Sequence, residues 1–426
     1  MLSRTFIEIG KADKVTFQDK DGNIVTIDNP VDTILAIQSG VDITKQRDLD
    51  WLKQKEWPKL KKPKGILRGV DLFSGCGGIT MGLWEACREN NLRLDMVMAC
   101  DLFPAAKTTF DQNFNPEQFL DQPIEHYVNG ELGAPPTPEE EALIELLGDV
   151  DIVVGGPPCQ GNSNLNNHTR RDDPRNELYM RMIRFVELFK PKIVLVENVR
   201  GVANNKQKVV PRANAFLNSL GYAVDHGVVK GQDIGVPQTR ARHFTVALNS
   251  PDANVDFDQF SEPTVPEARS VGWVIEDLQN KKRPSDALFY RPPKATKVNQ
   301  DRMNWFFEGP DGEDRHDLPN HLRPKCQQGD HTYPAVYSRM HWDKPAPTLT
   351  TGFGCNGRGR FTHPLKAKVL SPHEAARVQT FPDFYDFTMI EKRTDMHDLI
   401  GNAVPPLMAK HMLSKLIAIS QSESIE

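Results

Sequence analysis

The sequence lacks the features of a membrane protein and of a disulfide-stabilised protein. Its 426 residues contain no apolar run of about 18 residues or more, so we expect no membrane-spanning helix. The first residues show no signal-peptide pattern. The 6 cysteines are too sparse for a disulfide framework and form no CxxC pair. Together these absences indicate a reducing, intracellular compartment.

Clear metal-ligand spacing is also missing. His316, His321, Cys326 and His331 lie near one another in the sequence, but without a CxxC or HxxxH spacing. A zinc site there is the lesser alternative, and we predict no metal. We find no internal repeat and no low-complexity tract, which excludes the solenoid and fibrous classes.

An excess of negative charge argues weakly against a nucleic-acid partner, because the formal net charge is −5. The average hides a gradient, since residues 281–360 carry 14 Lys or Arg against 9 Asp or Glu, a net of +5, and the remainder therefore carries −10. A basic sector on an acidic body can steer a polyanion to one face. A solvated surface of mixed sign is the alternative, and charge alone does not decide between the two.

From residue 65 onward the sequence alternates between strand and helix patterns, which is typical of an α/β fold. Residues 66–73 predict a strand, Ser74-Gly75-Cys76-Gly77-Gly78 a glycine-rich turn, and residues 79–89 a helix. A second strand over residues 96–100 ends at Asp101, which lies 23 residues after Gly78. Glycines allow close approach of a ligand to the backbone, and an acid at this distance can bind ribose hydroxyls. The unit therefore predicts a nucleotide-type cofactor site.

A rigid turn follows the next predicted strand, at residues 150–154. It reads Gly155-Gly156-Pro157-Pro158-Cys159-Gln160, in which the prolines restrict the backbone before a soft nucleophile. Parallel sheets bind ligands at the carboxyl ends of their strands, so Cys159 is a candidate nucleophile; a buried, inert thiol is the alternative. The polar stretch 162–174 beside it predicts a mobile lid.

Charged side chains are predicted near the same edge. Glu197 stands at the carboxyl end of a strand over residues 193–199, where burial beside a substrate would raise its pKa enough for it to donate a proton. Taken alone, a surface acid at a strand end is the better interpretation. Arg240 and Arg242 alternate at the start of a strand leading to Leu248, which places them on one face. Two guanidinium groups there would lower the pKa of a thiol and bind anions.

The regular alternation stops at about residue 251 and resumes after residue 364. We therefore predict an N-terminal extension over residues 1–65 that includes a β-hairpin, a catalytic domain over residues 66–250 and 365–426, and a smaller irregular domain over residues 251–364. Capping boxes predict helices after Thr137 and Ser371, and a last helix follows Pro405-Pro406.

Six motifs in this order resemble those of the DNA cytosine-5 methyltransferases, over roughly residues 66–420. They are the glycine-rich turn from Asp71, the Pro-Pro-Cys-Gln loop, Glu197-Asn198-Val199, Gln238-Thr239-Arg240-Ala241-Arg242, Lys344-Pro345-Ala346-Pro347-Thr348 and Gly401-Asn402-Ala403-Val404. The resemblance implies a Rossmann-like domain that binds S-adenosyl-L-methionine, and a target-recognition domain over residues 251–364.

The resemblance also implies the roles of individual residues. Cys159 would add to C6 of a cytosine flipped out of duplex DNA, Glu197 would hold the ring at N3 and the exocyclic amine, Arg242 would contact the ring oxygen, and Arg240 would support the nucleophile loop. The residues expected to bind the cofactor are Phe73, Ser74, Gly75, Gly77, Gly78, Ile79, Asp101, Leu102, Pro158, Asn402, Ala403 and Val404. Those expected to bind DNA are Gln160, Asn162, Ser163, Arg170, Arg171, Arg358 and Arg360, the last two on phosphates in a flexible basic loop.

Several alternatives stay open at this level. The acid that contacts adenine in the family could be Glu131, Asp149 or Asp151. We expect a monomer acting on double-stranded DNA in a restriction-modification or DNA-marking role, with a cognate restriction endonuclease as a further partner. The expected location is the cytoplasm, at the nucleoid of a prokaryote, or the nucleus of a eukaryote. A tRNA cytosine-5 methyltransferase of the same family and a non-catalytic DNA-binding regulator are the rival functions, although the Cys-Phe-Thr signature of the tRNA enzymes is absent.

Overall fold

A computed structural model of the chain describes residues 14–18, 24–28, 43–60, 62–158, 177–204, 207–280, 287–308, 318–328 and 335–423. Its contacts divide the chain into two compact units, residues 1–54 and 55–426. Residues 55–426 contain every element discussed below except the first three. Within this unit, the separation of a catalytic part from a target-recognition part at residues 251 and 364 stays a proposal.

The first unit contains the predicted hairpin. Strands β1 (Lys14–Gln18) and β2 (Ile24–Asp28) pair antiparallel, with Lys14 opposite Asp28 and Gln18 opposite Ile24. Helix α2 (Ile43–Lys53) follows. The acidic turn between the two strands lies outside the described residues.

The second unit is organised around a seven-stranded sheet with the order β5-β4-β3-β6-β7-β9-β8. All neighbours pair parallel except β9, which runs antiparallel to both β7 and β8. The central strands are apolar on both faces, as expected of parallel strands covered by helices on both sides. Their bounds are β3 Gly65–Leu72, β4 Leu92–Cys100, β5 Gln118–Leu120, β6 Ile152–Gly155, β7 Ile193–Val199, β8 Ala223–Lys230 and β9 Ala241–Leu248.

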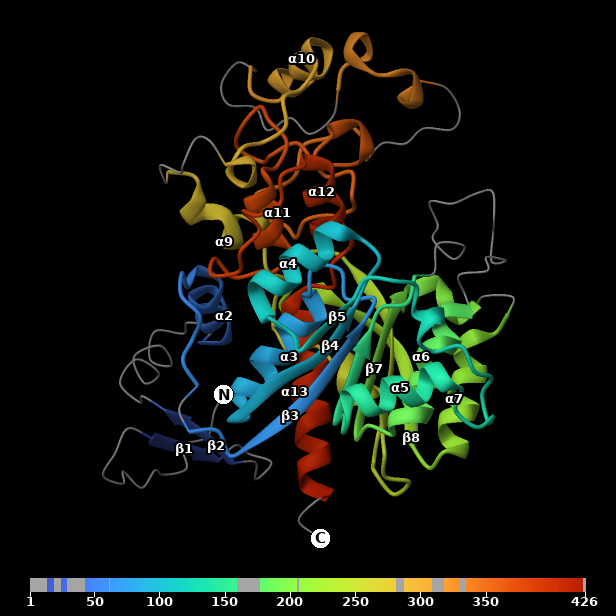
Figure 1. Ribbon diagram of the computed structural model, residues 1–426. Helices are drawn as coiled ribbons and strands as arrows, with labels where there is room; N and C mark the ends of the chain where they lie inside the picture. Colours follow the sequence, from blue (N-terminus) through green and yellow to red (C-terminus); the bar gives the residue numbers. More distant parts are fainter. Residues whose placement is uncertain are drawn as a thin grey trace. The chain divides into compact units, whose positions relative to one another are not determined.

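Helices cover both faces of this sheet (Figure 1). The main hydrophobic core includes Val70, Val153 and Val194 from the strands, and it packs against α5, α6 and α7. The long C-terminal helix α13 packs along α3 and also contacts β7 and β9. The bounds are α3 Gly78–Glu89, α4 Pro104–Phe114, α5 Pro138–Leu147, α6 Glu177–Phe189, α7 Val209–Ser219 and α13 Pro406–Glu423.

The region predicted to be irregular has little regular secondary structure in the part that the structure describes. Residues 251–280, 287–308, 318–328 and 335–364 contain short helices and isolated bridges but no named strand. Beyond them, Ser371 and Glu374 form the predicted capping box at the start of α11, as Thr137 and Glu140 do for α5. The α-helices of this part are α8 Asp258–Ser261, α9 Val271–Ile275, α10 Lys297–Trp305, α11 Pro372–Val378 and α12 Arg393–Asn402.

Three details differ from the sequence-based predictions. The second strand of the cofactor unit begins at Leu92 rather than at residue 96. The strand that precedes the Pro-Pro-Cys turn covers Ile152–Gly155 and thus takes in the first glycine. Strand β9 begins at Ala241, so Arg240 lies one residue before the strand. Just upstream, Gln238 forms an isolated β-bridge with Ala346.

Candidate active site

The glycine-rich turn joins β3 to α3 at the carboxyl edge of the sheet. Phe73, Gly75 and Gly77 all have positive φ, at 62°, 52° and 76°. The strained Phe73 is held because Ser74 N–H donates to the Cys100 carbonyl at the end of β4 (3.0 Å). A Cβ built on Gly75 meets nothing within 4 Å, so the turn has open space above it.

Two carboxylates flank this turn. Both oxygens of Asp101 accept backbone hydrogen bonds, from Gly75 N–H (2.8 Å) and from Phe103 N–H (2.9 Å). Burial raises the Asp101 pKa, and these backbone donors oppose the rise. Each oxygen keeps a further lone pair, so the carboxylate can still accept hydroxyl groups.

Asp71, the second carboxylate, is almost fully buried at the end of β3. Its Oδ2 accepts from the Thr80 hydroxyl, whereas its Oδ1 has no partner among the described residues. Burial raises the Asp71 pKa to about 7. A buried carboxylate oxygen without a donor is costly, and a bound cation would satisfy it.

The start of the Pro-Pro-Cys loop is pressed against its neighbouring strands. A Cβ on Gly155 would lie 2.5 Å from the Leu72 carbonyl, so only glycine fits there. Gly156 N–H donates to the same carbonyl (3.2 Å), and the Asn198 side chain donates to the Pro157 carbonyl (3.0 Å). The loop therefore leaves the sheet beside the carboxyl ends of β3 and β7.

Glu197 lies at this point. A Cβ on Gly156 would be 3.2 Å from Glu197 Oε2, while Glu197 Oε1 lies 2.9 Å from Arg242 Nε. Burial raises the Glu197 pKa, and the positive charges of Arg242 and Arg240 oppose that rise. A half-buried guanidinium and a buried carboxyl are thus held together next to the first residues of the Pro-Pro-Cys loop.

Arg240 has a different set of partners. Its guanidinium donates to the carbonyls of Leu349 (2.9 Å), Gly401 (3.4 Å) and Asn402 (3.3 Å). Its Nε has no partner among the described residues. In the described part of the chain Arg240 therefore braces the closing segments of the fold, and only its electrostatic field reaches Glu197.

The closing segment after α12 completes the edge of the site. A Cβ on Gly78, the first residue of α3, would lie 2.3 Å from the Val404 carbonyl, so the two backbones touch. Asn402 is exposed, Ala403 is half-buried and Val404 is buried. The predicted cofactor residues Phe73, Ser74, Gly75, Gly77, Gly78, Ile79, Asp101, Leu102 and Val404 are thus brought to one edge of the sheet. Leu102 is 60% exposed there.

Other predicted residues do not gather at this edge or cannot be placed. Cys159, Gln160, Asn162, Ser163, Arg170 and Arg171 lie outside the described residues, as do His316 and His331 of the weak zinc alternative. Asp151 accepts from Arg68 N–H (3.0 Å) and from Lys192 (3.0 Å), and Asp149 lies beside the same arginine; both stand before β6, at the amino edge of the sheet. Glu131 is exposed and follows β5 in the chain.

The loop with Arg358 and Arg360, predicted to be flexible, contains a series of hydrogen-bonded turns. Successive turns hold it through the pairs Phe353–Thr350, Cys355–Gly352 and Arg358–Cys355, each an N–H donating to a carbonyl. The stem of Arg358 packs against Gly352, while its residue remains exposed, and Arg360 donates to the Arg339 carbonyl (3.2 Å).

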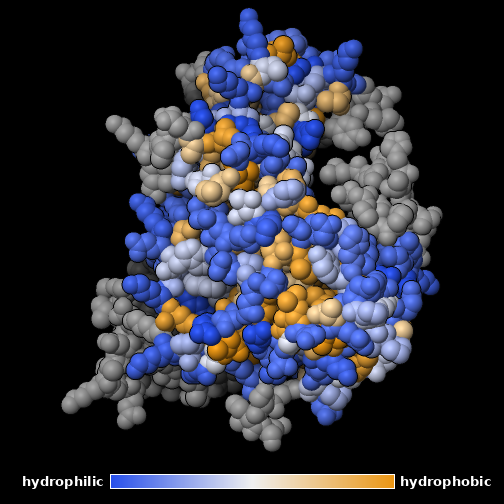
Figure 2. All heavy atoms as spheres, viewed as in Figure 1, coloured by the Kyte–Doolittle hydropathy of each residue, from blue (hydrophilic) through white to orange (hydrophobic). Residues whose placement is uncertain are grey.

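Exposed basic residues extend beyond this loop over the irregular region. They are Arg291, Lys294, Lys297, Arg323, Lys325 and Arg358. The face in Figure 2 is mostly hydrophilic around α10, at the top of the view. This surface suits a polyanion better than an apolar partner.

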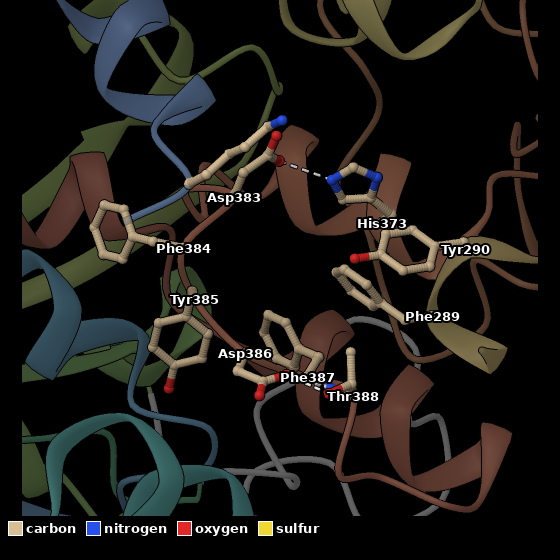
Figure 3. Close-up of a pocket in the computed structure, with 10 residues that line it drawn as sticks. Phe289, Tyr290, His373, Asp383, Phe384, Tyr385, Asp386, Phe387 and Thr388 are labelled. Atoms are coloured by element: carbon tan, nitrogen blue, oxygen red, sulfur yellow. Dashed lines mark hydrogen bonds and ion pairs between the residues drawn. The ribbon is translucent and has the colours of Figure 1, made fainter. Parts of the chain in front are cut away.

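A separate cavity of about 400 Å³ lies between Phe289-Tyr290, α11 and the loop 383–388 (Figure 3). His373 and Asp383 meet across it at 2.8 Å, and Arg377 holds the same carboxylate from behind. Both carboxylate oxygens of Asp383 are hydrogen-bonded by these groups. The cavity is therefore best described as an aromatic-lined gap in the packing of this region. Among the described residues no three His, Cys, Asp or Glu side chains gather as a metal site requires.

Sequence reasoning missed three residues of this edge. The sequence analysis names Asp71 only as part of a motif. Its position as the next-to-last residue of a buried strand could have marked it as a carboxylate of the site. Gln238 and Gln379 form buried hydrogen bonds to the closing segments; Gln238 was named only as part of a motif, and no local pattern points to Gln379.

The fold and the site define a class: an α/β enzyme of the Rossmann-like methyltransferase type, with an irregular region before its last helices. In agreement, residues 67–418 match the family model "C-5 cytosine-specific DNA methylase". The chain belongs to this family and is a DNA (cytosine-5)-methyltransferase.

The chain is similar to two bacterial enzymes over most of their lengths. It is 41% identical to the Type II methyltransferase M1.BsuMI of Bacillus subtilis over 375 residues, which cover 88% of this chain and 84% of that protein. It is 30% identical to the Type II methyltransferase M1.HphI of Haemophilus parahaemolyticus, over 83% of this chain and 87% of that protein.

Solved structures support the fold. A putative DNA modification methyltransferase encoded within a prophage (E. coli) matches with a TM-score of 0.57 at 22% identity, covering 83% of this chain and 99% of that one. The S. pombe Dnmt2 methyltransferase matches with a TM-score of 0.55 at 18% identity, covering 83% and 98%. No helix in the described ranges is long and apolar enough to cross a membrane.

Proposed function

We propose that this enzyme transfers the methyl group of S-adenosyl-L-methionine to C5 of a cytosine flipped out of duplex DNA, through a covalent adduct with Cys159. The observation that carries the proposal is the position of Glu197. Its carboxyl group lies beside Gly156, three residues before Cys159, and is paired with Arg242 at the carboxyl edge of the sheet.

The residues around the glycine-rich turn fit the cofactor. Bound there, S-adenosyl-L-methionine supplies an electrophilic methyl group on a sulfonium centre. The unpartnered Asp71 Oδ1 suits a positively charged amino group, and Asp101 suits ribose hydroxyls. Glu131 is our candidate for the adenine contact, and the exposed Leu102 offers an apolar surface to a ring. Phe73, Ser74, Gly75, Gly77, Gly78, Ile79, Pro158, Asn402, Ala403 and Val404 form the remainder of the proposed site.

The catalytic residues divide the work between nucleophile and acid. The Cys159 thiolate adds to C6, which makes C5 nucleophilic. Burial raises the Glu197 pKa, which favours proton sharing between this carboxyl group and N3 of the ring. Arg242 orients Glu197 and, from the same position, can contact the ring oxygen. A base inside a duplex cannot reach these groups, so the target base must leave the stack.

Recognition of the DNA falls to two parts of the chain. The stretch 160–171, with Gln160, Asn162, Ser163, Arg170 and Arg171, would close over the flipped base. Residues 251–364 would read the sequence, with Arg358 and Arg360 on phosphates. Since the loop of these two arginines is held in fixed turns, its phosphate contacts are preformed, which lowers the entropy cost of binding.

The relatives named Type II methyltransferases suggest a role in restriction-modification, in which the product protects a site from a cognate endonuclease. We propose the same role here, with the enzyme acting as a monomer. The tRNA and regulator alternatives gain no specific support, since the similarity to the S. pombe protein is one of fold.

Methyl transfer to duplex DNA tests the proposal. Purified enzyme incubated with labelled S-adenosyl-L-methionine should label duplex DNA but not tRNA, and Cys159→Ser should abolish the labelling while duplex binding persists. Equal labelling of tRNA, or full activity of Cys159→Ser, would contradict it.

A further inference from the structure

Two buried glutamines connect three segments that are far apart in the sequence. Gln238 and Gln379 are both fully buried, and Gln238 Nε2 donates to Gln379 Oε1 at 3.0 Å. Gln238 Oε1 accepts from Leu349 N–H at 2.8 Å. Gln379 Nε2 donates to the Ile400 carbonyl at 2.6 Å and lies 3.4 Å and 3.3 Å from the carbonyls of Gly401 and Ala403.

These contacts cap the C-terminal end of α12. The last four carbonyls of a helix have no partner within it, so other groups must satisfy them. Here Gln379 contacts three carbonyls in this stretch, and the Arg240 guanidinium donates to those of Gly401 and Asn402. A cation at a helix C-terminus is favourable, and no polar side-chain atom of either glutamine lacks a partner.

The capped end leads directly to the cofactor site. Ala403 and Val404 follow α12, and the Val404 carbonyl touches the backbone of Gly78, where α3 begins. Any movement of the end of α12 is therefore passed to the glycine-rich turn through a contact that leaves no free space.

We propose that Gln238 and Gln379 form a positioning relay that holds residues 402–404 against the glycine-rich turn and so sets the affinity for the cofactor. The relay also reaches Leu349, the residue after Thr348, within the irregular region. It touches neither substrate nor the reacting atoms. The inference rests on the proposed binding of S-adenosyl-L-methionine at this edge.

The first test replaces Gln379 by methionine, which is similar in size but has no hydrogen-bonding groups. We expect the KM for S-adenosyl-L-methionine and the Kd for S-adenosylhomocysteine to rise about tenfold, with kcat changed less than about threefold, because the lost interactions hold the binding surface only. Gln238→Met should act in the same direction, and the double variant should be less than additive because both belong to one relay. Asn90→Leu is the control, since Asn90 caps the carbonyl of Ala86 at the other end of α3 (2.8 Å).

The second test uses Gln379→Glu, whose carboxylate would face three carbonyl oxygens. Its pKa should be raised, so that the neutral form, which can donate as glutamine does, returns at lower pH. We therefore expect the Kd of this variant to approach that of the wild type as the pH falls from about 8 to about 6. A purely structural role would lower thermal stability without this recovery of affinity.

The outcomes separate the relay from the function on which it rests. If the wild type fails to bind S-adenosylhomocysteine, the proposed cofactor site is wrong. If the wild type binds and Gln379→Met binds equally well, or loses kcat rather than affinity, the relay is wrong. A Gln379→Glu variant whose Kd, divided by that of the wild type at the same pH, does not change with pH would also overturn it.

Discussion

The buried carboxylate of Asp71 gives the prediction with the clearest magnitude. Burial raises its pKa from an ordinary 3.8 to about 7. One pKa unit corresponds to about 1.4 kcal/mol, so the charged form costs the cofactor-free protein up to about 4 kcal/mol at high pH. Replacement by asparagine keeps the shape and removes the charge.

The sign of the effect follows from proton binding. Between about pH 4 and pH 7 the folded protein binds this proton more tightly than the unfolded chain, so the free energy of unfolding falls as the pH rises through that range. Asp71→Asn should remove this slope. The free energy of unfolding of Asp71→Asn, minus that of the wild type, should therefore increase by up to about 4 kcal/mol between acidic pH and pH 8.

Cofactor binding should show the reverse pattern, because a cationic ligand needs the carboxylate. We expect the wild-type Kd for S-adenosylhomocysteine to decrease as the pH rises through about 7, and Asp71→Asn to bind weakly without that dependence.

Urea denaturation of the cofactor-free protein and calorimetric titration, both at several pH values, measure the two effects. Asp149→Asn, at the exposed opposite edge of the sheet, is the matched control. Parallel pH curves for the wild type and Asp71→Asn in both assays would refute the reasoning.

Three further changes test the remaining site. Asp101→Ala should weaken S-adenosylhomocysteine binding by at least about tenfold and leave duplex affinity unchanged in the same titrations, whereas unchanged cofactor affinity would exclude the ribose contact. Glu197→Gln should lower the rate of methyl transfer by about 100-fold. Because burial raises the Glu197 pKa, the wild-type rate should decline with rising pH only above the pH range in which an ordinary glutamate titrates. A pH–rate profile that declines within that ordinary range would contradict the assignment. Replacing Arg358 and Arg360 by alanine should reduce the salt dependence of duplex binding by roughly one unit of slope per lost contact without changing the preferred site, and a relaxed preference with an unchanged slope would show that they read bases.

The parts of the fold that local signals determine could be predicted from the sequence. The strand at 193–199 and the capping boxes at Thr137 and Ser371 appear where they were expected, because continuous apolar runs and capping side chains act over a few residues. Glu197 was found because a carboxylate ending a buried strand must lie at the ligand-binding edge of a parallel sheet.

The remainder depended on contacts between distant segments. The support that Arg240 was expected to give the nucleophile loop stays a prediction, because that loop from Cys159 onward lies outside the described residues. The described partners of Arg240 are carbonyls of residues 349, 401 and 402, which no local pattern reveals. The loop of Arg358 was expected to be flexible because it is rich in glycine, and its glycine content did not reveal the backbone turns or the packing of Arg358 on Gly352. Asp149 and Asp151 looked equivalent to Glu131 until the sheet placed them at its opposite edge.

The most direct test of the central claim is the identity of the residue that bonds to the target base. Duplex DNA that contains 5-fluorocytosine at the methylated site prevents release of the enzyme after methyl transfer, so peptide mapping by mass spectrometry can locate the adduct. The account predicts a stable adduct on Cys159 that requires S-adenosyl-L-methionine and is absent from Cys159→Ser. An adduct on Cys76 or Cys355, or methylation of the DNA without any adduct, would contradict it.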